Sequence, residues 1–228
     1  ADELPGRPFV VPTGSIGLDD ILGCGGYPGG RITQIYGPPG GGKTFQSLIA
    51  IKNAQKIDPS AEQIFIDAEQ TFNPSWAESI GIDISKVVVV DSDSAQNGRE
   101  CFKLLLGSPK EDSKHVLVEK KNGLIDQIAS KELNVNFIVL DSIGSIIAPI
   151  EDTSEVGKSN MSPLARFLSK EVKRLSLDVS KTQMPFMFIN HVKAVMDAYS
   201  GKDHTYSGGN SYTHFLSANV YFEAIQRK

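Results

Sequence analysis

The stretch ITQIYGPPGGGKT, residues 32–44, joins a short apolar run to a glycine-rich loop that ends in lysine and threonine. An amphipathic segment follows, and its spacing predicts a helix over Thr44–Lys56. In this strand–loop–helix setting Gly37–Thr44 fits the pattern G-x-x-x-x-G-K-S/T, whose glycines let backbone N–H groups curl around phosphate oxygens. The helix N-terminus adds partial positive charge. The stretch therefore favours a phosphate-binding loop over a glycine-rich turn with a solvent-exposed lysine.

The rest of the chain alternates short apolar runs with longer amphipathic segments. The expected strands are Ile32–Tyr36, Ile64–Asp67, Val87–Asp91, Phe137–Asp141, Phe186–Asn190 and Ala218–Ala224. The other expected helices are Pro74–Ile80, Ala95–Leu106, Val116–Lys131 and Pro163–Lys181. Runs such as VVVV, FIVL and FMFI are typical of strands buried on both faces. The sequence predicts an α/β fold with a mainly parallel central sheet and helices on both faces, as one domain over residues 1–228.

Composition narrows the class of protein. The 228 residues include 23 basic and 27 acidic side chains, so the net charge of −4 argues against coating nucleic acid through overall charge. A net charge of −4 is still compatible with a local basic site that binds nucleic acid. No apolar run approaches the ~20 residues that span a bilayer. Cys24 and Cys101 are too few for a disulfide framework. We expect a cytoplasmic protein without a membrane partner.

Two acidic residues follow apolar runs. Asp141 ends FIVLD and is expected to organise Mg²⁺ together with the Thr44 hydroxyl. Glu69 follows FID and is a candidate general base for an attacking water, although a helix-capping or surface role stays open. Ligands of open parallel sheets bind outside the carboxyl ends of the strands. We therefore expect Lys43, Glu69, Asp141 and the pair at 190–191 to lie along one edge.

The stretch FINHVKAVMDAYSGKDHTYSGGN, residues 188–210, begins as a buried strand. The strand is expected to stop at Asn190 and His191, and the remainder is polar and rich in glycine. A structureless loop of this length within a compact domain is usually functional or disordered. The stretch predicts a long functional loop that hangs from two polar residues at the end of a strand.

Four segments in this order resemble the RecA family of recombination ATPases, and the likeness covers roughly residues 10–227. They are PTGSIGLDDILGCGGYPGGRITQIYGPPGGGKT at 12–44, FIDAEQTFNPSWAESIGID at 65–83, LDSIGSIIAP at 140–149, and FINHVK with SGGNS at 188–193 and 207–211. The resemblance implies a RecA-like P-loop NTPase core that uses ATP and Mg²⁺.

The resemblance also assigns roles at the nucleotide. It implies that Glu69 activates water, that Lys43 reaches the terminal phosphates, and that Thr44 and Asp141 hold the metal. Trp76 would lie against the adenine ring with Asn73 near the edge of the base, although Trp76 alone reads equally as a core aromatic. The implied nucleotide-binding set is Gly37, Pro38, Pro39, Gly40, Gly41, Gly42, Lys43, Thr44, Phe45, Asn73 and Trp76.

Single-stranded and duplex DNA are the partners that the resemblance implies. The segment from Glu151 to Met161 matches the family's first DNA-binding loop, and the stretch beyond residue 191 matches the second. His191 falls where the family senses the terminal phosphate, so nucleotide state would control the second loop. The implied DNA-binding residues are Met161, Arg166, Lys173, Lys193, Lys202, Gly208, Gly209 and Asn210. For Arg166 and Lys173 a solvated helix face is the alternative.

The chain departs from bacterial members of the family in two ways. Bacterial members carry glutamine at the position of His191, and the Asn-His pair and the insertion at 107–115 look more like recombinases of large tailed phages. The N-terminal segment 1–12 is short, so we expect the usual N-terminal oligomerisation element and the C-terminal region to be absent. A helical homo-oligomeric filament is then a property of the parent protein.

Three functions remain in competition at this point. The first is a DNA-dependent ATPase that binds single strands and promotes homologous pairing and strand exchange in recombination and repair. The second is a RecA-like regulatory ATPase or helicase motor. The third is a nucleotide-binding module without turnover. The SGGNS segment and Glu69 favour the first function.

Overall fold

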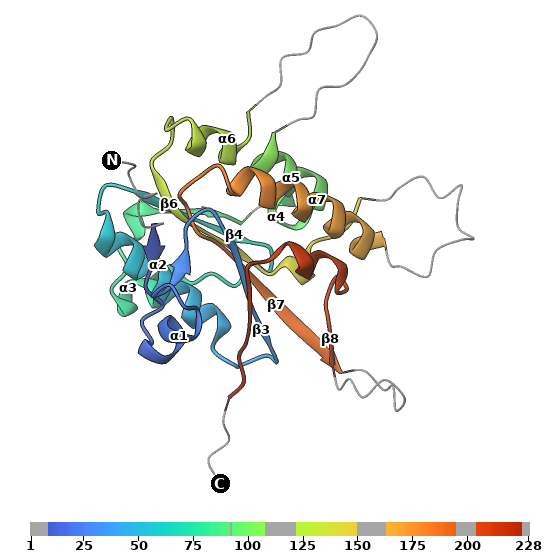
Figure 1. The fold of residues 1–228 in the computed structure, drawn as a ribbon, viewed down its shortest axis with the longest axis horizontal. Helices are drawn as coiled ribbons and strands as arrows, with labels where there is room; N and C mark the ends of the chain where they lie inside the picture. The colour runs from blue at the N-terminus through green and yellow to red at the C-terminus, as the bar shows by residue number, and fades with distance from the viewer. Residues whose placement is uncertain (1–8, 92, 108–121, 150–162, 195–203, 225–228) are drawn as a thin grey trace, which may run out of the picture.

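The computed structural model describes residues 9–91, 93–107, 122–149, 163–194 and 204–224. Its centre is a sheet of parallel strands in the order β5–β4–β6–β7–β3–β9 (Figure 1). These strands are β3 (Ile32–Gly37), β4 (Glu62–Asp67), β5 (Val87–Val90), β6 (Val135–Asp141), β7 (Phe186–Ala194) and β9 (Ala218–Tyr221). The α/β class and the parallel sheet predicted from the sequence are confirmed.

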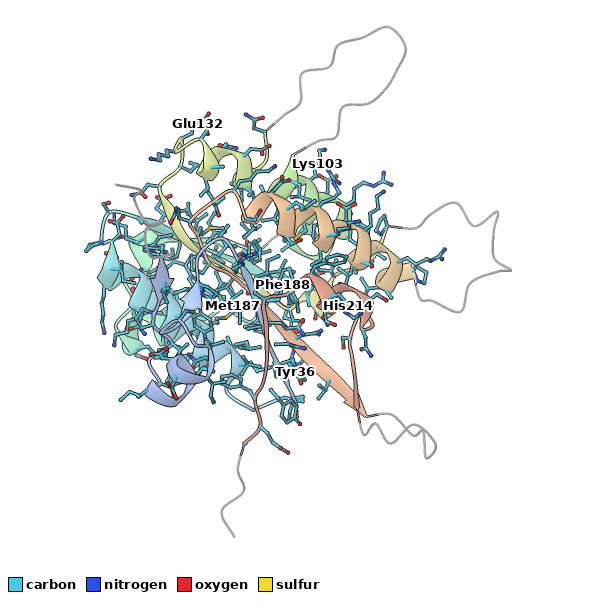
Figure 2. The ribbon with its side chains drawn as sticks, in the orientation of Figure 1. Tyr36, Lys103, Glu132, Met187, Phe188 and His214 are labelled. Atoms are coloured by element: carbon cyan, nitrogen blue, oxygen red, sulfur yellow. The ribbon has the colours of Figure 1, made fainter. Side chains whose placement is uncertain are left out.

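Helices cover both faces of the sheet because successive residues of each strand point to opposite sides. Met187 belongs to the core cluster beneath α2 (Lys43–Ile57) and α3 (Pro74–Ile80). Its neighbour Phe188, labelled beside it in Figure 2, belongs to the cluster beneath the other layer of helices. That second layer consists of α5 (Gly98–Leu106), α6 (Leu124–Ala129) and α7 (Pro163–Val179).

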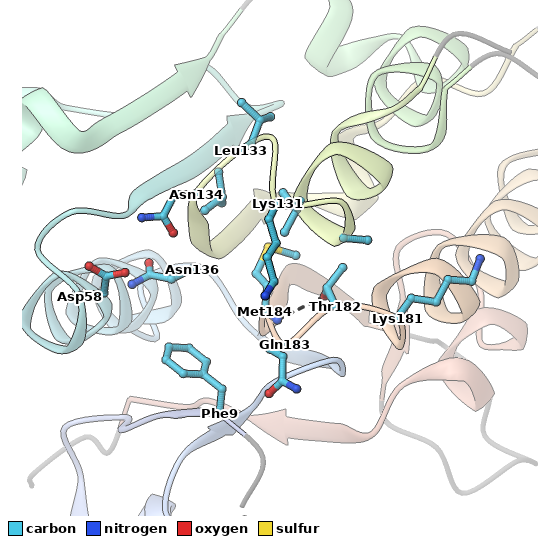
Figure 3. A pocket seen from close by; sticks show the side chains of 13 residues that line it. Phe9, Asp58, Lys131, Leu133, Asn134, Asn136, Lys181, Thr182, Gln183 and Met184 are labelled. Carbon is cyan, nitrogen blue, oxygen red and sulfur yellow. Dashed lines mark hydrogen bonds between the residues drawn. The ribbon is translucent and has the colours of Figure 1, made fainter. Parts of the chain in front are cut away.

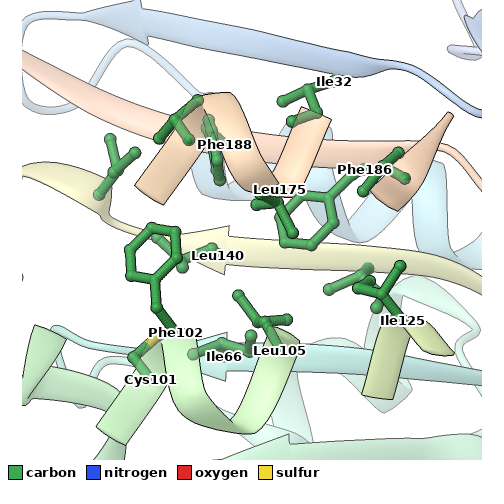
Figure 4. Close-up of a cluster of buried hydrophobic side chains, with 14 of the residues drawn as sticks. Ile32, Ile66, Cys101, Phe102, Leu105, Ile125, Leu140, Leu175, Phe186 and Phe188 are labelled. Atoms are coloured by element: carbon green, nitrogen blue, oxygen red, sulfur yellow. The ribbon is translucent and has the colours of Figure 1, made fainter. Parts of the chain in front are cut away.

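The larger core lies between the sheet and α5, α6 and α7. Phe102 and Leu105 of α5 and Leu175 of α7 meet Leu140 and Phe188 of the central strands (Figure 4). All seven residues of β6 are buried, and its central apolar run FIVL predicts this burial. This packing fixes the carboxyl ends of β4, β6, β7 and β3 next to one another.

Shorter elements complete the described chain. The sequence did not predict the two-stranded antiparallel sheet of β1 and β2. The remaining elements are β1 (Val10–Val11), β2 (Tyr27–Pro28), α1 (Ile16–Ile21), η1 (Ile84–Lys86), α4 (Asp93–Gln96), η2 (Ile143–Ser145), β8 (His204–Tyr206) and η3 (Ser211–Phe215). Among the described residues, no helix combines the length and the apolar character needed to cross a membrane.

Two helix predictions were wrong in their extent. The helix expected over Ala95–Leu106 is two helices, because the Asn97 side chain caps α5 by accepting from the N–H groups of Arg99 and Glu100. Within the described part of Val116–Lys131, α6 begins only after Gly123, whose backbone is extended. The part of that predicted helix before residue 122 lies outside the described residues.

The prediction that the strand at 186–190 ends at its polar pair was also wrong. β7 continues to Ala194 and pairs antiparallel with β8, in the register Val192↔Tyr206, Lys193↔Thr205 and Ala194↔His204. β-branched and aromatic residues such as Val192, Thr205 and Tyr206 favour an extended ladder in which backbone groups satisfy one another. The predicted loop is therefore a hairpin over its described part, and residues 195–203 lie outside that part.

Candidate functional site

One edge of the sheet gathers the predicted polar residues. Glu69 follows β4, Asp141 ends β6, and His191 lies in β7, which are neighbouring strands. A ligating atom from each of these three side chains lies within 4.8 Å of the other two. Lys43 and Thr44 follow the adjacent β3 at the start of α2. The topology thus brings together all four segments that the sequence marked.

The glycines of the loop between β3 and α2 serve two purposes. Gly40 and Gly42 have φ angles of +74° and +84° and open space beside them, so the backbone turns there and stays accessible to a ligand. Gly37 and Gly41 instead allow the chain just after β9 to pass closely, since a Cβ atom would lie 1.9 Å and 2.9 Å from the Phe222 carbonyl oxygen. Part of the glycine pattern is therefore required by packing.

Lys43 points back over the same loop. Its ammonium group donates to the carbonyl oxygens of Gly37 at 3.1 Å and of Pro38 at 2.8 Å, and the side chain is buried. Burial lowers its pKa, an effect that the nearby carboxylates Asp141 and Glu69 oppose. The positive charge is held inside the turn formed by the loop, where phosphate oxygens would be its neighbours.

Thr44 and Asp141 form the oxygen-rich part of the site. The Thr44 hydroxyl donates to Asp141 Oδ2 at 2.8 Å. Burial raises the pKa of Asp141 to about 6, and the charge of Glu69 acts in the same direction. A hydroxyl beside a carboxylate is the hard oxygen donor set that Mg²⁺ prefers. Because a cation would offset the cost of the buried negative charge, the residues present fit a magnesium ion.

Glu69 is held by three donors that converge on one oxygen. Oε1 accepts hydrogen bonds from Ser142 at 2.6 Å and Ser145 at 2.9 Å, and lies 2.7 Å from His191 Nε2. These bonds, that of His191 first, lower the pKa of Glu69 to about 2 against the opposing effect of burial. Glu69 is therefore a weakly basic carboxylate in this arrangement.

Ser142 and Ser145 were missed by sequence reasoning. They lie at either end of η2, the single turn that follows β6, and their hydroxyls are 2.9 Å apart. The spacing of three residues directly after a candidate metal aspartate was the available signal, because one turn then places both hydroxyls on the same side. The alternative that Glu69 is a helix cap or a surface acid does not fit these contacts.

Asn190 and His191 face different surroundings, although the sequence treated them as a pair. His191 reaches Glu69, whereas the fully buried Asn190 donates to the Ser207 carbonyl at 3.1 Å and to the Tyr212 hydroxyl at 2.6 Å. Consecutive strand residues point to opposite faces, so the side chain of Asn190 lies in the core and that of His191 lies in the candidate site.

Phe45 and Trp76 form an exposed aromatic pair beside the phosphate loop. Their ring centroids are 6.2 Å apart with planes inclined at 27°, and the side chains are 47% and 40% exposed. Trp76 is therefore not a core aromatic. Asn73 caps α3, since its side-chain oxygen accepts from the Trp76 N–H at 3.0 Å. The cap places the Trp76 ring at the start of that helix.

The predicted DNA-binding residues are only partly described. Arg166 and Lys173 are exposed on α7, seven residues apart and so on one face. Gly208 and Gly209, with φ angles of +85° and +77°, lie against the first turns of the same helix, and Asn210 is exposed. Met161 and Lys202 lie outside the described residues, and of Lys193 the structure describes the backbone in β7.

A pocket of about 620 Å³ opens near the amino ends of β6 and β7 (Figure 3). Its lining includes Phe9, Asp58, Asn136, Lys181 and Met184. None of the predicted site residues contributes to it. The pocket therefore lies at the amino ends of the central strands, whereas the site residues predicted from the sequence lie at the carboxyl ends.

Comparisons with known proteins agree with the geometry. The family model described as the RecA N-terminal domain matches residues 8–120 and 117–227. Protein RecA of Clavibacter michiganensis subsp. michiganensis is 31% identical over 217 residues, which cover 95% of this chain and 53% of that protein. The mitochondrial DNA repair protein recA homolog of Dictyostelium discoideum is 32% identical over 211 residues, covering 92% and 41% respectively. The chain spans about half the length of the curated relatives it matches.

Proposed function

The chain belongs to the RecA family, and from that premise we propose that it is the ATP-hydrolysing core of a DNA recombinase. It binds ATP with Mg²⁺, hydrolyses it to ADP and phosphate, and couples hydrolysis to binding single-stranded DNA. The observation that carries this proposal is the convergence of Glu69, Asp141 and His191 next to Lys43 and Thr44 at one edge of the sheet.

The chemistry assigned to each side chain follows from its surroundings. The backbone at Gly40 and Gly42 and the ammonium of Lys43 bind the phosphates, because the loop turns its open side toward them. Thr44 and Asp141 would hold Mg²⁺, which would neutralise charge on the phosphates when bound. Glu69 orients the attacking water and accepts its proton. Phe45 and Trp76 offer exposed ring faces to the adenine.

His191 is proposed to control the base. With three donors on one oxygen, Glu69 has a pKa of about 2 and accepts a proton poorly. A terminal phosphate within reach of His191 would compete for its Nε2 hydrogen bond. Transfer of that bond from Glu69 to the phosphate raises the basicity of the carboxylate at the moment that substrate is present. The same movement acts on β7, which continues into the hairpin with β8.

The DNA surface is proposed on the side of α7 that carries Arg166 and Lys173, together with the turn at Gly208, Gly209 and Asn210. Phosphate contacts from the two cations, together with the backbone of the turn that the glycines allow to pack against α7, would grip the DNA backbone without reading bases. Homologous pairing, strand exchange and assembly into a filament on single strands are proposed for the protein on this basis. We also propose that residues 1–228 act as one domain.

ATP hydrolysis with and without a single-stranded oligonucleotide tests the proposed function. We expect DNA to stimulate turnover and Glu69→Gln to lower stimulated turnover by about 100-fold or more while ATP binding persists. The matched control is Glu62→Gln, which alters an exposed glutamate at the opposite end of β4. If Glu69→Gln turns over as fast as Glu62→Gln, the assigned chemistry is wrong. If ATP is hydrolysed without any response to DNA, a regulatory ATPase fits better than a recombinase.

A further inference from the structure

A chain of buried and partly buried hydrogen bonds leads away from His191 into the body of the protein. The backbone N–H of His191 donates to Asn190 Oδ1 at 2.7 Å, and Asn190 Nδ2 donates to the Tyr212 hydroxyl at 2.6 Å. That hydroxyl donates in turn to Gln34 Oε1 at 2.7 Å. Gln34 Nε2 continues the chain to Asn219 at 2.9 Å. The chain thus links β7, η3, β3 and β9.

We propose that Tyr212 is a positioning residue that transmits the state of the Gly208–Asn210 turn to His191 through the Asn190 side chain. In this proposal Tyr212 acts through the Asn190 side chain and not on the nucleotide itself, so its action is indirect. The inference deepens the proposed function, because it names the residue through which the DNA-binding turn would influence the residue that holds Glu69.

The Asn190 amide is fully committed by its neighbours. Its Nδ2 group makes two hydrogen bonds, to Tyr212 and to the Ser207 carbonyl, and its oxygen accepts from the His191 N–H. Asn190, Gln34 and Tyr212 all have fully buried side chains. An amide with this set of partners has one orientation that satisfies every atom. Loss of the Tyr212 hydroxyl removes one of the contacts that fix it.

Tyr212 is also well placed to sense the turn. η3 begins at Ser211, directly after Asn210, so displacement of the turn moves the Tyr212 ring. The turn itself is tightly enclosed: a Cβ at Gly208 would lie 2.5 Å from Leu168 and a Cβ at Gly209 would lie 2.9 Å from Ala165. Tight packing of this kind passes movement on to neighbours because there is little space to absorb it.

A second close contact connects the same group to Glu69. A Cβ at Gly144 would lie 2.4 Å from the Ser207 side chain and 2.7 Å from Asn190 Oδ1. Gly144 is the middle residue of η2, between the two serines that hold Glu69. The turn, the Asn190 amide and the carboxylate are therefore contiguous.

The test compares two tyrosine variants that each lose one buried hydroxyl. Tyr212→Phe removes the hydroxyl that joins Asn190 to Gln34. Tyr27 belongs to the core cluster beneath α2, and Tyr27→Phe removes a hydroxyl that accepts a hydrogen bond from Gln46. We expect Tyr212→Phe to lower DNA-stimulated ATP turnover by about tenfold, with turnover in the absence of DNA changed by less than about twofold. Tyr27→Phe should leave both rates unchanged. Full stimulation in Tyr212→Phe, or equal loss in Tyr27→Phe, overturns the inference.

Amide hydrogen exchange decides the same question without nucleotide or DNA. In Tyr212→Phe the His191 amide should exchange at least about tenfold faster, because its acceptor Asn190 loses its fixed orientation. The Ile189 amide in the same strand should keep its rate, which a general loosening of the fold would not allow. Equal exchange rates of the His191 amide in the wild-type chain and the variant refute the positioning role. This outcome can be read even if DNA fails to stimulate the wild-type chain and the proposed function is wrong.

If Tyr212→Phe folds poorly, the double variant Gln34→Leu/Tyr212→Phe replaces two buried hydrogen-bonding partners by apolar groups. Such a paired replacement avoids leaving the Gln34 oxygen unsatisfied. The same two measurements then apply, with Gln34→Leu alone as the reference. The inference fails if the double variant and Gln34→Leu respond to DNA alike.

Discussion

Replacing Asp141 by asparagine should make the protein more stable when no metal or nucleotide is bound. The carboxylate is buried, and its charge is opposed by the nearby Glu69 and Asp67. Asparagine has nearly the same shape and can still accept the Thr44 hydroxyl. The substitution therefore removes a destabilising charge from the fold while it removes a proposed magnesium ligand from the site.

The size of the effect follows from the pKa of Asp141. A rise from 3.8 to about 6 corresponds to about 3 kcal/mol of lost stability at high pH, at about 1.36 kcal/mol per unit. This pKa already includes the hydrogen bond from Thr44, which favours the charged form. Because asparagine resembles the neutral acid, we expect Asp141→Asn to raise the free energy of unfolding by about 3 kcal/mol near pH 7.5.

The pH dependence has a definite sign. Because the folded-state pKa is raised, the folded state binds the Asp141 proton more tightly than the unfolded state does. The penalty is fully present above about pH 6 and disappears as the pH falls below about 4. The difference in stability between Asp141→Asn and the wild-type chain should therefore shrink over that window.

Urea unfolding in EDTA at about pH 7.5 and about pH 4 measures both quantities. Asp20→Asn, at an exposed position of α1, is the control and should change stability by less than about 0.5 kcal/mol. Adding Mg²⁺ and ATP should raise the stability of the wild-type chain and leave that of Asp141→Asn nearly unchanged. An Asp141→Asn variant that is no more stable than the wild-type chain at about pH 7.5, or equally stabilised at both pH values, would refute the reasoning.

Three further predictions concern the same edge of the sheet. His191→Ala should raise the pKa of Glu69 from about 2 toward 4.5, so the stability that its hydrogen bonds supply above pH 4.5 should be smaller, and its loss on acidification should be complete at a higher pH; carboxyl NMR and acid unfolding measure this. Lys43→Ala should weaken ATP binding by at least about tenfold in calorimetry, since a buried charge-assisted contact to phosphate is lost. The fluorescence of Trp76, the single tryptophan, should change on ATP binding and respond less in Phe45→Ala.

Local sequence patterns predicted the features that depend on local chemistry. The continuous apolar run of β6 and the helical spacing of α7 gave elements whose bounds agree with the structure to within two residues. The phosphate loop was recognisable because its glycines, lysine and threonine have a fixed order. The meeting of Glu69, Asp141 and His191 followed from parallel strand order, which places carboxyl ends at one edge.

Features that depend on partners distant in sequence were not predictable in this way. The continuation of β7 beyond His191 requires β8 as a partner, and no local periodicity in the polar stretch marks that pairing. The break at Asn97 had a local signal, the capping preference of asparagine before a helix, but the apolar spacing on both sides outweighed it. The burial of Tyr212 depends on Gln34 and Asn190, which lie 178 and 22 residues away.

The three donors to Glu69 differ in what can move them. Ser142 and Ser145 belong to a single turn that is anchored to the buried end of β6, so they stay beside the carboxylate whatever binds. His191 lies in β7, with the proposed phosphate site on one side and the hairpin to β8 beyond it. A contact that either ligand can displace is the one able to carry regulation, because a ligand shifts an equilibrium only by its different interaction with the two states. The basicity of Glu69 should therefore follow the position of His191, whose hydrogen bond is the largest cause of the low pKa, while the two serines supply a smaller lowering that persists when His191 moves.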